Sequence, residues 1–362
     1  MSGVSAQADR GIGPVEIVGA GLIGTSIALA CRRAGIEVLL SDVAPEHLRT
    51  ASGLGAGRAR EDGDVARLVV VAVPPDHLGE AIRAALDAAG PETVVTDVGS
   101  VKSGPLAAVE GHPAVSRYVG SHPMAGSERS GPLAASASLF DGRPWAITPG
   151  GGTSPDAVHA VERLVEVCGA VPVRLSPSEH DRAVARTSHV PHLLAALVAG
   201  TLAGAPPQHL ALSGQGVRDV TRVAAGDPGL YSQIIGANAI AVTNLLAELQ
   251  QRLDLAAEAV AAGDRDGLAS LLAHGVAGTR AIPGKHGGPL QAMATVWVSV
   301  PDHPGELARL FADAGESDVN IEDVRIDHDP GRPVGLVELD VAADRATALL
   351  DALESRGWDA HR

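Results

Sequence analysis

Hydrophobic positions along this chain fall into three successive patterns, and the first of them covers residues 14–178. Short β-branched runs alternate there with stretches in which apolar residues recur at helical spacing. Such an alternation is typical of a mainly parallel sheet with helices on both faces, so it predicts an α/β domain. Strands are predicted at residues 15–18, 37–41, 68–73, 93–98, 118–120, 145–148 and 171–175.

The second pattern covers residues 179–282 and is helical throughout. Alanine and leucine dominate it, and no β-branched run occurs before Ala294. Many small residues allow helices to pack closely, as they do in the core of a dimer. We therefore expect an all-helical domain that mediates dimerisation.

The third pattern covers residues 294–362 and follows a linker, residues 283–293, that is rich in glycine and proline. An alternating run at 295–300 is followed by an amphipathic helix after Gly305. Two further strand-like runs come after Ile321 and at 335–341, and a last helix covers 345–356. The order βαββα predicts a small α+β unit of the ferredoxin-like type.

Composition and charge exclude several classes of function. The chain has 362 residues, 45% of them apolar, and a net charge of -15. It is long enough for two or three folded domains, and its surface would on average repel nucleic acid and anionic membranes. An anionic substrate would therefore need local positive charge.

Three features indicate a cytoplasmic protein without a membrane partner. The two cysteines, Cys31 and Cys168, lie within apolar patterns, so no disulfide framework is expected and a reducing compartment fits. Residues 1–13 are polar and lack the apolar core of a signal peptide. The longest uncharged apolar run, 193–202, is shorter than the roughly 20 residues that a bilayer span needs.

The strand at 15–18 leads directly into the glycine-rich segment Gly19-Ala20-Gly21-Leu22-Ile23-Gly24 and then into a helical pattern. A tight turn of this kind directs backbone amides and the positive end of a helix dipole toward a pyrophosphate. The next strand leads to Asp42, about twenty residues on, where a carboxylate accepts hydrogen bonds from an adenosine ribose. The pattern predicts an NAD site, because Asp42 would repel the 2′-phosphate of NADP. The alternative is an ordinary strand-to-helix turn.

Two segments after later strands carry candidate chemistry. The strand at 93–98 is followed by Gly99-Ser100-Val101-Lys102, which places Ser100 either near the nicotinamide or at the cap of the next helix. A glycine-punctuated loop at 120–132 contains His122 and Glu128. A histidine titrates near neutrality and can remove a proton from a bound alcohol, so this loop beside a nicotinamide predicts hydride chemistry.

A histidine pair lies within the helical domain. His189 and His192 fall on one helix face, and they could ligate a metal, bind a substrate carboxylate or be buried structural residues. No nearby cysteine or third histidine completes a metal set, so no metal is expected and the carboxylate is favoured.

Arg222 is a second candidate for carboxylate binding. It lies among small residues ahead of the turn Gly226-Asp227-Pro228, where it could be held for bidentate recognition. The alternative is a surface ion pair with Asp219 or Asp227.

Taken together these motifs resemble the prephenate dehydrogenase family, which includes arogenate dehydrogenase, over about residues 14–290. The resemblance implies an α/β Rossmann domain at 14–178 followed by an all-α dimerisation domain at 179–282, and a homodimer. It also implies NAD-dependent oxidative decarboxylation of prephenate to 4-hydroxyphenylpyruvate, on the route to tyrosine. It rests on Gly19 to Gly24, Gly99 to Lys102, the Ser121-His122-Pro123 to Gly131 loop, Ser188-His189-Val190-Pro191-His192 and Asp219-Val220-Thr221-Arg222.

The resemblance also implies residue roles. His122 would take the proton of the ring C4 hydroxyl, and Ser100 would hydrogen-bond both His122 and that hydroxyl. Arg222 would bind the ring carboxylate and His192 the pyruvyl side chain, with Ser188 and His189 nearby and Glu128 gating the pocket. The implied cofactor contacts are Gly19, Gly21, Leu22, Ile23, Gly24, Asp42, Val73 and Ser127. Two residues depart from the family pattern, Gln215 before the Arg222 segment and Ser127 where threonine is common.

The C-terminal unit resembles an ACT domain, a module that commonly binds amino acids at dimer interfaces. The resemblance rests on the turn Asp302-His303-Pro304-Gly305 and on Val319-Asn320-Ile321. It implies regulatory contacts by Asp302, Pro304, Gly305, Asn320 and Ile321, with tyrosine as the effector. The alternative is a dimerisation module that binds no ligand.

Two competing functions stay open on the sequence alone. Arogenate dehydrogenase uses the same chemistry on a substrate with an amino group in place of the keto group. A non-catalytic sensor of NAD and an amino acid is the other, and it would have no physical need for the set Ser100, His122, His192 and Arg222.

Overall fold

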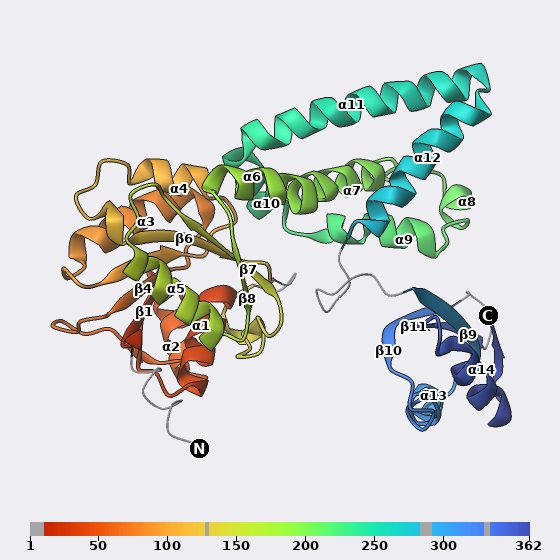
Figure 1. The fold of residues 1–362 in the computed structure, drawn as a ribbon, viewed down its shortest axis with the longest axis horizontal. Coiled ribbons are helices and arrows are strands. Elements are labelled where there is room, and N and C mark those ends of the chain that lie inside the picture. The colour runs from red at the N-terminus through yellow and green to blue at the C-terminus, as the bar shows by residue number, and fades with distance from the viewer. Residues whose placement is uncertain (1–10, 127–129, 283–291, 329–333) are drawn as a thin grey trace. The chain divides into compact units, whose positions relative to one another are not determined.

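The computed structural model describes residues 11–126, 130–282, 292–328 and 334–362. The chain divides into two compact units, Met1–Leu255 and Ala256–Arg362. Figure 1 shows the order of the helices and strands along the chain.

The first unit contains an eight-stranded sheet. It includes every strand predicted from the hydrophobic pattern and one more, β3, whose two exposed residues carry no such pattern. The strands are β1 (Val15–Val18), β2 (Val38–Ser41), β3 (Arg58–Ala59), β4 (Leu68–Val71), β5 (Val94–Asp97), β6 (Tyr118–Pro123), β7 (Pro144–Pro149) and β8 (Val171–Arg174).

The strand order is β3-β2-β1-β4-β5-β6-β7-β8. Strands β3 to β6 in this order are parallel, whereas β7 runs antiparallel to β6. The side on which successive strands join the sheet changes at β1, since β2 lies on one side of β1 and β4 on the other. In open α/β sheets ligands bind outside the carboxyl ends of the strands at such a point.

Helices cover both faces of this sheet (Figure 1). One apolar core joins the sheet to α1 and α5, through residues such as Ile27 and Val161, and another joins it to α3 through Leu78 and Ile82. All four residues of β4 are buried, as expected for a strand covered on both sides. The helices are α1 (Leu22–Arg33), α2 (Pro45–Gly53), α3 (Pro75–Ala88), α4 (Ser103–Ala108) and α5 (Pro155–Val167), with 3-10 turns η2 (Val115–Arg117) and η3 (Pro132–Ala134).

A helical region follows the sheet, and its first helix packs against β7 and α4. A capping box formed by Ser176 and Glu179 fixes the start of that helix. Its elements are α6 (Pro177–Val184), the π-helical turn η4 (Ala185–His189), α7 (Val190–Gly200), α8 (Pro207–Leu210), α9 (Gln215–Thr221), η5 (Arg222–Ala225), α10 (Pro228–Ala237) and α11 (Ala239–Ala262). As predicted, no described residue between β8 and 292 lies in a strand.

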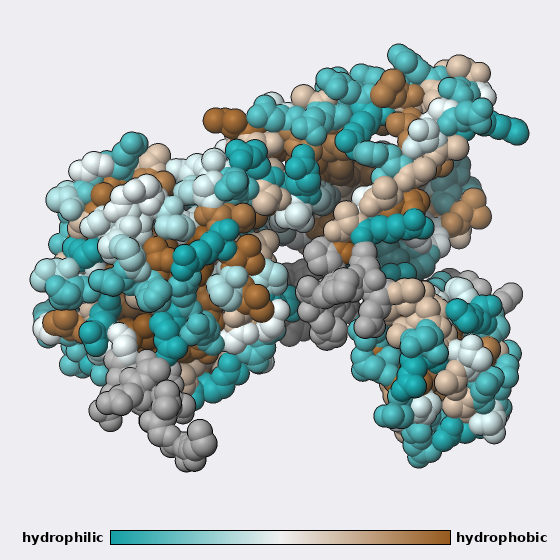
Figure 2. Space-filling model, viewed as in Figure 1, coloured by the Kyte–Doolittle hydropathy of each residue, from teal (hydrophilic) through white to brown (hydrophobic). Residues whose placement is uncertain are grey.

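The helical region buries little apolar surface within one chain. Its core centres on Ala185, Val190 and Val242, while Leu197 is 60% and Ile240 83% exposed. Figure 2 shows apolar side chains, in brown, at the surface over these helices. No single helix of the described ranges is long and apolar enough to cross a bilayer, and α10 with α11 passes that test only as a pair bent by 93°.

The second unit begins within α11, continues through α12 (Arg265–Arg280), and ends in a four-stranded antiparallel sheet of order β10-β11-β9-β12. Buried valines and leucines of the sheet pack against both following helices. The predicted βαββα order is confirmed, and the chain adds the short edge strand β12. The elements are β9 (Met293–Pro301), α13 (Glu306–Gly315), β10 (Ile321–His328), β11 (Val334–Ala342), α14 (Ala346–Ser355) and β12 (Asp359–His361).

Candidate active site

The glycine-rich turn between β1 and α1 lies at the carboxyl end of the sheet. Gly19 has φ +104°, and a Cβ there would lie 2.4 Å from the Ala72 carbonyl oxygen and 3.2 Å from the Val73 nitrogen. A Cβ at Gly24 would lie 1.9 Å from the Gly19 carbonyl oxygen. These two glycines are required by the fold itself, because strand, turn and helix approach too closely for a side chain.

Gly21 differs from its two neighbours in the motif. It caps α1, and no atom lies within 4 Å of an added Cβ. Leu22 and Ile23, the first residues of α1, are only partly buried. This open helix N-terminus fits a dinucleotide pyrophosphate, whose negative charge the backbone N–H groups and the helix dipole would stabilise.

Asp42 lies beside the same turn. Its carboxylate accepts hydrogen bonds from the Ala20 amide (2.6 Å) and the Ala44 amide (2.7 Å), and His47 Nδ1 lies 3.6 Å away. Each carboxylate oxygen keeps a second lone pair, so the group can also accept from a ribose hydroxyl. The arrangement fits the predicted NAD site.

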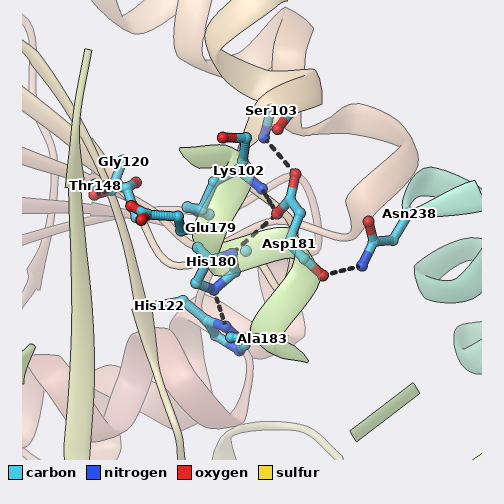
Figure 3. Close-up of polar contacts among 12 residues, drawn as sticks. Lys102, Ser103, Gly120, His122, Thr148, Glu179, His180, Asp181, Ala183 and Asn238 are labelled. Atoms are coloured by element: carbon cyan, nitrogen blue, oxygen red, sulfur yellow. Dashed lines mark hydrogen bonds and ion pairs between the residues drawn. The ribbon is translucent and has the colours of Figure 1, made fainter. Parts of the chain in front are cut away.

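A buried polar network lies at the end of β6 and contains His122. Its Nδ1 lies 2.9 Å from His180 Nε2, and His180 Nδ1 lies 2.9 Å from an Asp181 oxygen (Figure 3). His180 and Asp181 belong to α6 and are both buried. The first turn of the helical region thus meets the candidate base on the sheet.

Asp181 is the anchor of this network. It accepts hydrogen bonds from the Lys102 and Ser103 amides, each at 2.8 Å, in addition to His180. Burial alone would raise the pKa of the Asp181 carboxyl, but these hydrogen bonds outweigh it and lower the pKa to about 2. Asp181 is therefore ionised at neutral pH.

His122 is held neutral. Burial lowers its pKa well below 6.5, and electrostatic interactions with His180, Lys102 and His189 lower it further. A neutral imidazole is the form that can accept a proton from an alcohol. The sequence prediction of His122 as a base is thus compatible with its surroundings.

Lys102 lies behind the site, with its side chain buried in the protein. Its ammonium group is fully buried, paired with Asp97, and donates to the Ser121 carbonyl oxygen at 2.7 Å. Tyr118 donates to the other Asp97 oxygen at 2.7 Å. Burial lowers the pKa of Lys102, and the Asp97 carboxylate opposes that shift. The charge of Lys102 is therefore neutralised within the protein.

Ser100 does not orient His122 in this structure. Its hydroxyl is buried and has no hydrogen-bond partner, whereas His122 Nδ1 is taken by His180. The expected contact between Ser100 and His122 is thus wrong for the chain without ligand. Ser100 is also not the N-cap of α4, which is Lys102. A buried hydroxyl without a hydrogen-bond partner is available to hydrogen-bond a ligand.

The two histidines of the helical region have different surroundings. His189 is buried, and the Asn238 amide nitrogen lies 3.1 Å from its Nδ1. Burial and the neighbouring His180 lower its pKa to about 4. His189 therefore fits the buried structural alternative better than a direct substrate contact, while Ser188 beside it is partly exposed.

His192 stacks in parallel on Tyr231, with ring centroids 3.4 Å apart. Its Nδ1 is buried without a hydrogen-bond partner, and burial lowers its pKa. His192 therefore has an unused polar atom for a ligand.

Arg222 lies at the junction of α9 and η5, which packs against α7. Its side chain is exposed and forms no ion pair with any described residue. Asp219 instead accepts a hydrogen bond from Gln215, and Asp227 caps α10 through the Leu230 amide. The surface ion pair that competed with ligand binding is therefore not formed.

Ser127 and Glu128 lie outside the described residues. Within the described ranges, no group of three or more His, Cys, Asp or Glu side chains is arranged to hold a metal ion.

The candidate regulatory residues fall in two groups at opposite ends of the second sheet. Asp302, Pro304 and Gly305 follow β9, and Gly305 has φ +96° at the start of α13. Asn320 and Ile321 lie at the start of β10, whose first residue pairs with Val341 near the other end of β9. Nine residues of strand, about 30 Å, separate the two ends of β9.

Two family models match this chain. They are "Prephenate dehydrogenase, nucleotide-binding domain" over residues 27–174 and "Prephenate dehydrogenase, dimerization domain" over residues 176–274. The first match ends at residue 174 and the second begins at residue 176.

Individual relatives agree with these models. "Probable prephenate dehydrogenase NovF" of Streptomyces niveus is 38% identical over 357 residues, 95% of this chain and 98% of that protein. The crystal structure of prephenate dehydrogenase from A. aeolicus, in complex with hydroxyphenyl propionate and NAD+, has a TM-score of 0.68 at 27% identity and covers 73% of this chain and 96% of that one. Arogenate dehydrogenase of Synechocystis has a TM-score of 0.64 at 26% identity, over 73% and 98% of the two chains.

Proposed function

This chain belongs to the prephenate dehydrogenase family, and we propose that it oxidises prephenate at the carboxyl end of its parallel sheet with His122 as the base. It is an NAD-dependent oxidoreductase that acts on prephenate in tyrosine biosynthesis.

The turn after β1 would hold the cofactor. The open N-terminus of α1 at Gly21 would bind the pyrophosphate, and Asp42 would accept from the ribose. Gly19, Gly24 and Val73 shape the turn, and Leu22, Ile23 and Ser127 complete the proposed contacts. NAD, when bound, accepts the hydride that leaves the substrate ring.

His122 would remove the proton from the C4 hydroxyl of prephenate. The O–H bond breaks as the carbonyl forms, and the proton passes to the free nitrogen of the imidazole. The resulting ring ketone loses CO2 because the product becomes aromatic. Ser100, whose buried hydroxyl has no protein partner, would hydrogen-bond the same substrate oxygen.

Local charge would hold the dianionic substrate in an acidic protein. Arg222 is exposed and unpaired among the described residues, so its guanidinium is available for the ring carboxylate. His192 would use its unpartnered Nδ1 for the pyruvyl side chain. Ser188 is a further candidate contact to the substrate, and Glu128 is a candidate gate of the pocket. His189 is buried and would support the site without touching the substrate.

The observation that carries the assignment is the partly buried contact between His122 and His180, on the same sheet edge as the dinucleotide turn. The test is to mix the protein with NAD and either prephenate or arogenate and follow the absorbance of reduced NAD. Faster turnover of prephenate supports the proposal. Exclusive use of arogenate would assign the alternative substrate, and no turnover with either would favour a sensor of NAD and an amino acid.

We infer that the protein is a homodimer of the cytoplasm. The helical region leaves large apolar side chains such as Leu197 and Ile240 exposed, and the family model that covers it describes a dimerization domain. Both cysteines are free and buried, which suits a reducing compartment. Light scattering on the purified protein should give twice the chain mass of 36.6 kDa.

We infer further that the C-terminal unit is an ACT domain that binds tyrosine. The support is its ferredoxin-like strand order and the N-terminus of α13 at Gly305, which no side chain caps. Because Asp302, Pro304 and Gly305 lie far from Asn320 and Ile321 in one chain, both groups can contact one ligand only if two copies supply them. Calorimetric titration with tyrosine should detect binding and an accompanying change in activity. No binding and no change would leave a module that only dimerises.

A further inference from the structure

We propose that His180 and Asp181 are positioning residues that fix the proton of His122 on Nδ1 and so leave Nε2 as its basic nitrogen. The proposal rests on the proposed role of His122 as the base. It follows from the direction in which each hydrogen bond of the buried network must run.

The direction is set at Asp181. One carboxylate oxygen lies 2.8 Å from the Lys102 amide and 2.9 Å from His180 Nδ1, and the other lies 2.8 Å from the Ser103 amide. Backbone amides can only donate, so Asp181 is an acceptor on both oxygens. An ionised carboxylate in this position requires that His180 Nδ1 carry the proton.

The tautomer of His122 follows from that of His180. A neutral imidazole has one N–H and one acceptor nitrogen, so protonated Nδ1 leaves His180 Nε2 as an acceptor. The atom that faces it at 2.9 Å is His122 Nδ1, which must therefore donate. The remaining nitrogen of His122, Nε2, then has its lone pair free.

The charged groups that face His122 disfavour its protonation on balance. Lys102 from the segment after β5 and His189 from η4 both disfavour added positive charge, whereas Asp181 favours it. Asn238 ties the network to α10 and α11, since its amide donates to the Asp181 carbonyl oxygen at 2.8 Å. The pair is thus fixed from β6, α6, η4 and the start of α11.

This arrangement would act at the moment of proton transfer. The proton of the substrate hydroxyl would move to His122 Nε2, while Nδ1–H keeps its hydrogen bond to His180. The carboxylate of Asp181 would stabilise the resulting positive charge through His180. His180 and Asp181 touch neither substrate nor cofactor in this account, and they act only through His122.

Nitrogen-15 NMR of the protein labelled at histidine tests the tautomer without any turnover. We expect His122 to show a protonated Nδ1 and an unprotonated Nε2 at neutral pH. In Asp181→Asn, whose amide must turn its NH2 either to a backbone donor or to His180, we expect loss of this single tautomer. A wild-type His122 with its proton on Nε2 would overturn the proposal, whether or not the protein oxidises prephenate.

Kinetics of a graded pair of variants test the consequence. His180→Leu removes the acceptor, and we expect kcat with prephenate to fall about 100-fold or more with little change in either KM. His180→Gln keeps a side-chain carbonyl that can accept from His122 Nδ1, and it should recover most of the rate. His159→Gln, at a side chain that is 80% exposed, is the matched control. Unchanged kcat in folded His180→Leu would contradict the proposal, and an inactive wild type would instead reject the proposed function.

Discussion

His192 and Tyr231 stack face to face, with ring centroids 3.4 Å apart and planes inclined by only 6°. Gly226 lies against the edge of both rings, because a Cβ there would lie 2.8 Å from a Tyr231 ring carbon and 3.0 Å from His192 Cε1. The imidazole plane is therefore set by α10 and the turn that precedes it. If His192 binds the pyruvyl side chain, Tyr231 controls how well it does so.

Replacing Tyr231 should weaken substrate binding more than chemistry. In Tyr231→Leu we expect KM for prephenate to rise roughly 3- to 10-fold, the equivalent of an aromatic pair worth about 0.5–1.5 kcal/mol. KM for NAD should not change. Tyr231→Phe keeps the ring and serves as the control. An unaltered KM for prephenate in Tyr231→Leu would show that the stack has no part in binding.

Acid should destabilise the fold before it protonates the ordinary carboxylates. The pKa of His189 is lowered from 6.5 to about 4 by burial and by His180, so the folded state resists its protonation. A group of this kind contributes stability that is complete above pH 6.5 and is lost as the pH falls toward 4. The midpoint of thermal unfolding should therefore decrease between about pH 7 and pH 5.

The variant His189→Gln should show a shallower decrease over the same pH range, since one of the resisting groups is gone. His159→Gln should follow the wild type, because that imidazole is exposed. Parallel curves for His189→Gln and the wild type would mean that His189 titrates normally in the folded protein.

Lys102 should matter for stability through Asp97. Both side chains are fully buried, so Lys102→Met leaves an unpaired carboxylate beneath β6. We expect the free energy of unfolding to fall by about 3–5 kcal/mol, measured by denaturant titration. The double change Lys102→Met with Asp97→Asn should recover part of the loss. If Lys102→Met lowers the free energy of unfolding by less than about 1 kcal/mol, the pair is far more exposed to solvent than the structure shows.

Asp42 should set cofactor affinity and preference. Asp42→Asn removes a charged acceptor, and a hydrogen bond to such a group is worth about 1.5–3 kcal/mol, so KM for NAD should rise roughly 10-fold or more. Activity with NADP should decline less, because the repulsion of its 2′-phosphate is relieved. Asp156→Asn, on the exposed first turn of α5, is the control. Equal KM for NAD in wild type and Asp42→Asn would remove Asp42 from the cofactor site.

The sheet and the dinucleotide turn could be predicted from the sequence because their signals are local. A buried strand such as β4 is a continuous apolar run, and the turn at Gly19 and Gly24 follows from backbone crowding between adjacent elements. Only the strands β3 and β12 were not predicted, since each is a short edge strand with mostly exposed residues.

The interior of the site could not be predicted in the same way. His180 lies 58 residues from His122 along the chain and belongs to no motif, so only the packing of α6 on the sheet brings the two together. The adjacent pair His180-Asp181 directly after the capping residue Glu179 was the one local signal. The buried pair of Lys102 and Asp97 could not be predicted either, because Asp97 reads in the sequence as the polar end of a strand.

The most direct test of the account is the rate of NAD reduction by prephenate in wild type and in His122→Asn, at saturating NAD. We predict turnover by the wild type and a fall in kcat of about 100-fold or more in the variant, because proton transfer from the C4 hydroxyl loses its base. Binding of NAD, measured by calorimetry, should be unchanged, which separates lost chemistry from a damaged fold. A His122→Asn enzyme with the rate of the wild type would contradict the assignment of His122.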